Sequence, residues 1–172
     1  MLFHFFQNNI SAVEKLYEEA IALVDNMEGK TVYDLFCGTG TISQAVARKA
    51  KHVIGVELVE EAVESARKNA ELNGLTNCDF IAGDVFKVLD QVEEKPDVII
   101  VDPPRMGIQP KALDKILKYG VDQIVYISCN PKTLIENLYY MEYNGYRVDY
   151  LKPFDNFPNT KHIETIVLLT RV

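Results

Sequence analysis

The segment Asp34-Leu35-Phe36-Cys37-Gly38-Thr39-Gly40 decides the fold of this chain. It continues an apolar segment that begins at Thr31 and predicts a strand, and it leads into a helical pattern from Thr41 to Ala50. Glycines in a turn between a strand and a helix let the backbone come close to a ligand. In parallel sheets, ligands bind at the carboxyl ends of the strands, where such turns lie. The segment therefore predicts an α/β sheet with a ligand site at one edge.

Strands and helices alternate along most of the chain. Apolar segments predict strands at 31–36, 52–57, 78–82, 97–101 and 123–127, and helical patterns follow at 41–50, 59–72, 85–89, 111–119 and 132–143. An additional helix precedes them and stops before Gly29. Two further strands, at 146–151 and 163–169, are joined without a helix, which predicts an antiparallel pair. We therefore expect one Rossmann-like α/β domain with a seven-stranded, mostly parallel sheet and an antiparallel last strand.

Composition and charge restrict the class of protein. The chain has 172 residues, of which 48% are hydrophobic and 25% charged, values that are ordinary for a soluble domain with a single core. No apolar segment is long enough to span a bilayer, and no signal peptide is recognisable. The three cysteines form no CxxC pair, which predicts a cytoplasmic protein without a disulfide framework or a metal site. The net charge of −7 argues against tight nucleic-acid binding by this chain alone.

The residues around the glycine turn indicate the ligand. Glu57 ends the second predicted strand, where a carboxylate can accept hydrogen bonds from ribose hydroxyls. Ser43 replaces the third glycine of a dinucleotide fingerprint, which disfavours a nicotinamide dehydrogenase. Asp34, four positions before Gly38, fits a ligand with a cationic amino acid end, as in S-adenosylmethionine (SAM). Asp84 follows the third strand, where it would lie near the adenine or cap the next helix.

A cysteine lies at a second strand-to-helix junction, in Ile127-Ser128-Cys129-Asn130-Pro131. Asn130 is a good helix N-cap, and Pro131 suits the first helical position. A thiol at this place faces the positive end of the helix, which lowers a cysteine pKa and favours the thiolate. The alternative is a buried structural cysteine, because free cysteine is among the most buried residue types.

The fourth strand ends in Asp102-Pro103-Pro104-Arg105. A similar motif occurs in methyltransferases that act on exocyclic amines, but there an aromatic residue follows the prolines, and here Arg105 does. Cytosine-5 RNA methyltransferases have a cysteine after the proline pair, and this chain has none there.

Five motifs of this chain resemble those of the RNA uracil-5-methyltransferase family. They are the glycine turn, Asp102–Arg105, Ser128–Pro131, Phe5–Asn9 and Asp155–Glu164. The family's members modify tRNA or large-subunit ribosomal RNA. The resemblance extends over the whole chain, with the motifs in the family's order. It implies the class I SAM-dependent methyltransferase fold, SAM as cofactor and RNA as partner.

The resemblance implies Cys129 as the nucleophile that adds to C6 of uracil, and Glu164 as the base that removes the C5 proton. Asp102 would form hydrogen bonds near the pyrimidine ring or the cofactor. Topology also places Cys129 and Glu164 at the same sheet edge, because Glu164 begins a strand that runs antiparallel to the others. The alternative for Glu164 is a solvated charge on an edge strand. The cofactor-binding candidates are Gln7, Asp34, Phe36, Gly38, Gly40, Thr41, Glu57, Asp84 and Asp102.

The resemblance also implies that residues 1–172 form only the catalytic domain, with 1–29 as an N-terminal motif and helix leading into its core. The family's N-terminal RNA-binding and central domains would be absent. We therefore expect the chain to bind SAM but to methylate RNA weakly or not at all, with 23S ribosomal RNA favoured over tRNA as substrate. Two alternatives are a SAM-dependent methyltransferase that acts on another nucleobase or protein position, and a non-catalytic SAM-binding module.

Overall fold

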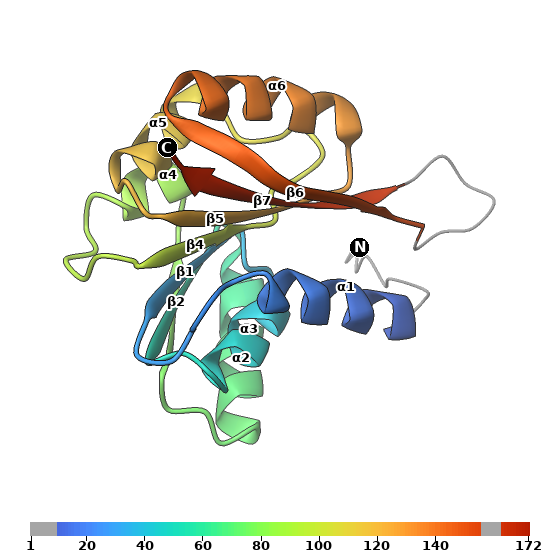
Figure 1. The fold of residues 1–172 in the computed structure, drawn as a ribbon. Coiled ribbons are helices and arrows are strands. Elements are labelled where there is room, and N and C mark those ends of the chain that lie inside the picture. Colours follow the sequence, from blue (N-terminus) through green and yellow to red (C-terminus); the bar gives the residue numbers. More distant parts are fainter. Residues whose placement is uncertain (1–9, 156–162) are drawn as a thin grey trace.

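The computed structural model describes residues 10–155 and 163–172, which form a seven-stranded sheet with helices on both faces (Figure 1). The helices are α1 (Ile10–Ala22), α2 (Thr41–Ala47), α3 (Glu60–Leu72), α4 (Val85–Val88), α5 (Pro110–Lys118) and α6 (Pro131–Tyr143). The strands are β1 (Thr31–Leu35), β2 (His52–Glu57), β3 (Cys78–Ala82), β4 (Val98–Val101), β5 (Gln123–Ser128), β6 (Tyr146–Phe154) and β7 (Glu164–Arg171).

The strand order is β3-β2-β1-β4-β5-β7-β6. The first five strands in this order are parallel, and β7 runs antiparallel to both β5 and β6. This confirms the predicted sheet with its antiparallel last strand. From β1 the chain proceeds outward to β3 and then returns to β4 on the other side of β1. The strand order thus reverses at β1 and β4, and sheets of this kind bind ligands in a crevice outside the carboxyl ends of the strands at such a reversal.

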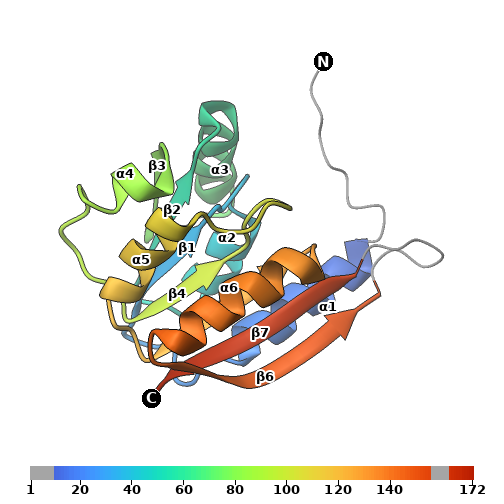
Figure 2. The same cartoon turned by 90° about the horizontal axis from the view of Figure 1, so that it is seen from above.

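The helices α1, α2 and α3 cover one face of the sheet, and α4, α5 and α6 cover the other (Figure 1). Figure 2, which views the molecule from above, shows α6 lying along β7 and β6. The central strands are buried on both sides, and all four residues of β4 have no exposed surface. Alternate residues of β1 therefore belong to different clusters, with Val32 packed toward α1 and α2 and Tyr33 toward α4 and α5. Continuous apolar strands of this type are expected in a sheet covered on both faces.

Several element boundaries differ from the prediction, among them the ends of α2 and β6, which differ by three residues each. Helix α2 ends at Ala47, and a turn follows in which the N–H of Lys49 donates to the carbonyl of Val46, three residues back, at 2.9 Å. Strand β6 extends three residues beyond the predicted end and includes Pro153, which pairs in register with Thr165 of β7. A proline is tolerated there because β6 is an edge strand with one hydrogen-bonded neighbour. Among the described residues, no helix combines the length and apolar character needed to cross a bilayer.

Candidate active site

The glycine turn after β1 is held against β2 by backbone hydrogen bonds. The N–H groups of Phe36 and Cys37 both donate to the carbonyl of Val56, at 2.8 and 3.1 Å. Phe36 has a φ of 67°, an uncommon value for a residue with a side chain, and Gly38 has a φ of 54°. A Cβ atom added to Gly38 would meet no heavy atom within 4 Å. The turn therefore presents open backbone at the carboxyl edge of the sheet.

Gly40 serves packing instead. It has a φ of 78°, and an added Cβ would lie 2.8 Å from Cε1 of Phe80 and 2.9 Å from Cβ of Ala66. Helix α2 begins directly after it, at Thr41, whose side chain is exposed. The absence of a side chain at Gly40 therefore lets the turn approach β3 and α3 closely.

Glu57 connects the turns that follow β1 and β2. Its carboxylate accepts hydrogen bonds from the N–H of Gly38, at 3.0 Å, and from the N–H of Val59, at 2.9 Å. A carboxylate has about four lone-pair sites, so the half-buried Glu57 keeps the capacity to accept from hydroxyls as well.

Asp34 is completely buried in β1. Its Oδ2 accepts from the hydroxyl of Ser43 on α2, at 2.5 Å, and among the described residues its Oδ1 has no hydrogen-bond partner. Burial raises the pKa of Asp34 to about 7, and the nearby charge of Glu57 adds to this shift. Sequence reasoning treated Ser43 only as a missing glycine, and its bond to Asp34 was not foreseen.

Asp84 occupies the N-cap position of α4, but its side chain forms no capping hydrogen bond. It is exposed at the same carboxyl edge as Glu57, since β2 and β3 are parallel neighbours that end in register. Gln7 lies outside the described residues, as do Asn156–His162 of the motif that precedes Glu164.

Cys129 directly follows β5, and Asn130 caps α6 by accepting from the N–H of Lys132, at 3.2 Å. In the antiparallel pair of β5 and β7, Ser128 lies opposite Thr165. Cys129 follows Ser128, and Glu164 precedes Thr165. The two residues therefore adjoin each other at this edge, although 35 positions separate them in sequence. Asp102 follows β4, the other neighbour of β5, and completes a group of three.

These groups affect one another electrostatically. Burial raises the pKa of the Cys129 thiol, and Glu164 and Asp102 raise it further, whereas Arg105 lowers it. The expected lowering of this pKa is therefore wrong, because burial and two carboxyl groups outweigh the cation and the start of the helix. Burial also raises the pKa of Glu164, with Arg105 opposing the shift, and raises the pKa of Asp102 to about 8, with contributions from Glu164 and Asp34.

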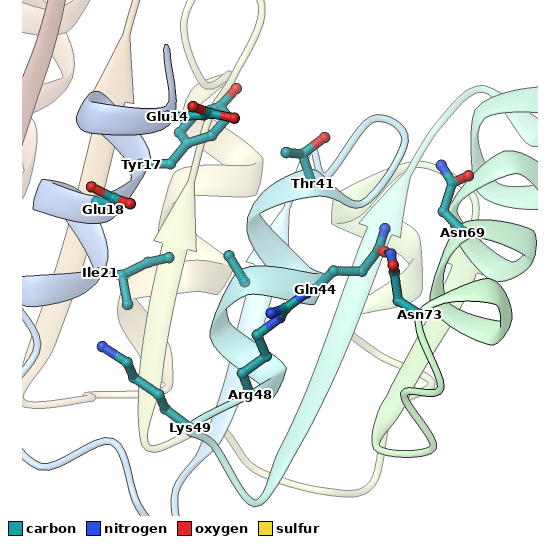
Figure 3. A pocket seen from close by; sticks show the side chains of 11 residues that line it. Glu14, Tyr17, Glu18, Ile21, Thr41, Gln44, Arg48, Lys49, Asn69 and Asn73 are labelled. Carbon is teal, nitrogen blue, oxygen red and sulfur yellow. The ribbon is translucent and has the colours of Figure 1, made fainter. Parts of the chain in front are cut away.

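A separate hollow of about 850 Å³ lies between α1 and α2 and extends toward α3 (Figure 3). Glu14 and Glu18 of α1 line one side, and Arg48 and Lys49, which directly follow α2, line the other. Of the described candidate site residues, only Thr41 borders it. The hollow is therefore distinct from the group formed by Cys129, Glu164 and Asp102.

The fold and the site at its carboxyl edge define the class of SAM-dependent methyltransferases of the class I type. This chain belongs to the tRNA (uracil-5-)-methyltransferase family, whose sequence profile matches residues 3–172. An "uncharacterized RNA methyltransferase" from Clostridium acetobutylicum is 52% identical over 170 residues, which are 99% of this chain and 37% of that protein. Another with the same description, from Clostridium tetani, is 56% identical over 167 residues, or 97% of this chain and 37% of that protein.

A solved structure supports the same assignment. The tRNA (uracil-54, C5)-methyltransferase of Pyrococcus abyssi, in complex with S-adenosyl-L-homocysteine, superimposes with a TM-score of 0.85 and is 32% identical. The match covers 98% of this chain and 40% of that one. This chain thus spans well under half the length of the relatives that it matches.

Proposed function

We propose that this chain is the catalytic part of an enzyme that transfers a methyl group from SAM to C5 of a uridine in RNA, through a covalent bond between Cys129 and C6. The observation that supports the proposal is the convergence of Cys129, Glu164 and Asp102 from three adjacent strands at one sheet edge. This edge adjoins the crevice at β1 and β4. Family membership supplies the reaction type.

The residues of the crevice suit SAM. The backbone at Gly38 has open space above it, and Asp34 has a buried oxygen without a partner among the described residues. A cation near Asp34 would compensate that oxygen, and Glu57 and Asp84 could accept from the ribose and adenine groups. Phe36, Gly40, Thr41, Asp102 and Gln7 complete the proposed cofactor set. When bound, SAM supplies an electrophilic methyl group.

Cys129 begins the reaction, because C5 of uracil is a poor nucleophile. The thiolate forms a bond to C6, and electron density moves to C5 and the ring carbonyl. C5 would then attack the methyl group of bound SAM, whose S–CH3 bond would break to leave S-adenosylhomocysteine. Glu164 removes the proton that remains on C5, and the bond between sulfur and C6 breaks, which returns the thiolate and leaves 5-methyluridine. The complete sequence of steps therefore needs Cys129 and Glu164 within reach of the same uracil ring.

In this proposal Asp102 acts as a hydrogen-bond donor. Its raised pKa of about 8 keeps this carboxyl largely protonated at neutral pH, so it can donate a hydrogen bond. A donor aimed at a ring carbonyl stabilises the negative charge that develops after thiolate addition. Arg105, which favours the charged forms of both Cys129 and Glu164, counteracts the burial that otherwise suppresses them.

Two variants test the mechanism in the natural full-length protein. Cys129→Ala should abolish both methylation and the covalent complex with RNA that contains 5-fluorouridine. Glu164→Gln should form the covalent complex on normal RNA and release it slowly, because proton removal from C5 precedes release of the thiolate. SAM affinity, measured by calorimetry, serves as the control for folding. Full methylation by Cys129→Ala, with no tritium released from C5-labelled uridine, would exclude the mechanism.

The RNA substrate is a separate part of the proposal. We propose 23S ribosomal RNA, although the family description and the Pyrococcus abyssi structure both name tRNA. Mapping 5-methyluridine in both RNAs from cells with and without the gene decides between them. The net charge of −7 further implies that this chain alone holds RNA weakly, and we propose that it still binds SAM. Calorimetry with SAM and a binding assay with RNA test the two halves separately.

A further inference from the structure

The loop between β4 and α5 carries Asp102 and Arg105, and its position determines how these groups face Cys129. The loop turns at residues 104–107, where the N–H of Gly107 donates to the carbonyl of Pro104, at 2.8 Å. After this turn the chain passes along α6, the helix that begins two residues after Cys129.

One face of α6 binds the backbone of this loop. Asn130, Thr133 and Asn137 are spaced at i, i+3 and i+7, which places their side chains on the same side of a helix. The side-chain amide of Asn130 donates to the carbonyl of Arg105, at 2.8 Å, and the hydroxyl of Thr133 donates to the same carbonyl, at 3.1 Å. The loop segment that holds Arg105 is thereby fixed to the first turn of α6.

Asn137 holds the far side of the turn. Its Oδ1 accepts from the N–H of Ile108, at 2.8 Å, and its Nδ2 donates to the carbonyl of the same residue, at 3.1 Å. Both backbone groups of Ile108 are thus paired with one side chain, which fixes the direction of the peptide as well as its distance. The hydroxyl of Tyr126, a buried residue of β5, also donates to Oδ1 of Asn137, at 2.9 Å. Asn137 therefore joins the loop, α6 and β5.

The loop approaches α6 too closely for a side chain at position 107. Gly107 has a φ of 74°, and an added Cβ would lie 2.9 Å from Oδ1 of Asn137 and 3.1 Å from Cβ of Thr133. Asn130, Thr133 and Asn137, which follow Cys129 in sequence, thus all contact this segment of the loop.

We propose that Asn137 is a positioning residue for methyl transfer: it fixes the 102–109 loop to α6 so that Asp102 and Arg105 keep their places beside Cys129. The inference rests on the proposed function but concerns a residue that touches neither RNA nor cofactor in it. A displacement of about 1 Å at a reacting group can cost roughly 100-fold in rate, so loss of this connection should act on turnover rather than on cofactor binding.

The test uses the natural full-length protein with Asn137→Ala and a matched control on the same helix. The control is Asn144→Ala, which removes a side-chain amide that donates to the carbonyl of Tyr140, at 2.8 Å, at the other end of α6. Asn137→Asp keeps the oxygen that accepts from Ile108 and Tyr126 but loses the donor to the Ile108 carbonyl. Should Asn137→Ala fail to fold, the Asp variant provides the test.

Two measurements separate the possible outcomes. Amide hydrogen exchange at Ile108 reports the connection itself, and the split between kcat and KM reports its effect on catalysis. For Asn137→Ala we expect faster exchange at Ile108 and a kcat lower by about 10- to 100-fold, with KM for SAM changed far less. Asn137→Asp should be intermediate, and Asn144→Ala should equal the wild type.

The results that overturn the inference differ from those that overturn the proposed function. Unchanged exchange at Ile108 would show that Asn137 does not hold the loop. Faster exchange with an unchanged kcat would show that the connection does not serve catalysis. Absence of 5-methyluridine with the wild-type protein would instead refute the uracil reaction, whatever the exchange at Ile108.

Discussion

Replacing Asp34 by asparagine should change the pH dependence of stability by an amount that follows from its burial. The folded protein holds this carboxyl with a pKa of about 7, against 3.8 for the free side chain. The folded state therefore binds more protons than the unfolded state between these values, and stability falls as pH rises through this window. One pKa unit corresponds to about 1.4 kcal/mol, so the cofactor-free protein loses about 4 kcal/mol between pH 4 and pH 8 through Asp34.

Asp34→Asn removes this loss because an amide does not ionise. The amide has a cost of its own, about 1–3 kcal/mol for a buried group without a full set of partners, but that cost is the same at every pH. The difference in unfolding free energy between variant and wild type should therefore shift by about 4 kcal/mol in favour of the variant from pH 4 to pH 8. Ser43→Ala removes the hydroxyl donor to Asp34 and should increase the stability that is lost as the pH rises, because that donor favours the charged carboxylate.

Urea unfolding followed by far-ultraviolet circular dichroism at several pH values measures this difference, because the chain has no tryptophan for fluorescence. The experiment is done without cofactor. A difference between variant and wild type that stays constant within about 1 kcal/mol from pH 4 to pH 8 would refute the reasoning, since Asp34 would then lose its proton as easily in the folded as in the unfolded chain.

Two further changes test the geometry of the turn and of the cysteine. Arg105→Gln should raise the pKa of the Cys129 thiol further, because it removes a cation that favours the thiolate. The pH dependence of alkylation by iodoacetamide, followed at the Cys129 peptide by mass spectrometry, measures this pKa. An unchanged or lower pKa would contradict the electrostatic effect of Arg105. Gly40→Ala should cost about 2–4 kcal/mol of stability, since the φ of 78° disfavours a side chain and the new Cβ would lie 2.8 Å from Phe80. If urea unfolding shows that the free energy of unfolding falls by less than about 1 kcal/mol, this packing is contradicted.

The sequence predicted the elements and the shared edge of Cys129 and Glu164 because both depend on local patterns. Alternation of strands and helices fixes the direction of β5, and a loop without a helix fixes the direction of β7. Strand direction alone then places the end of one beside the start of the other.

Contacts between distant segments were not predictable in this way. The pKa of Cys129 depends on burial and on carboxyl groups from β7 and from the end of β4, which the local sequence does not show. Ser43 was interpreted only as a departure from a glycine motif, and its bond to Asp34 depends on how α2 packs against β1. Asn137 gave no signal, since an asparagine in a helix is ordinary until the loop it binds is known.

The place of β7 has a consequence for synthesis. It is the last described strand to leave the ribosome, yet it lies inside the sheet, between β5 and β6. A nascent chain that stops before Glu164 leaves one side of β5 unpaired, and exposed strand edges promote aggregation. The same unfinished chain lacks the carboxylate that the proposed reaction needs to release its RNA. Synthesis of β7 thus closes the gap in the sheet and supplies the carboxylate beside the cysteine in a single event.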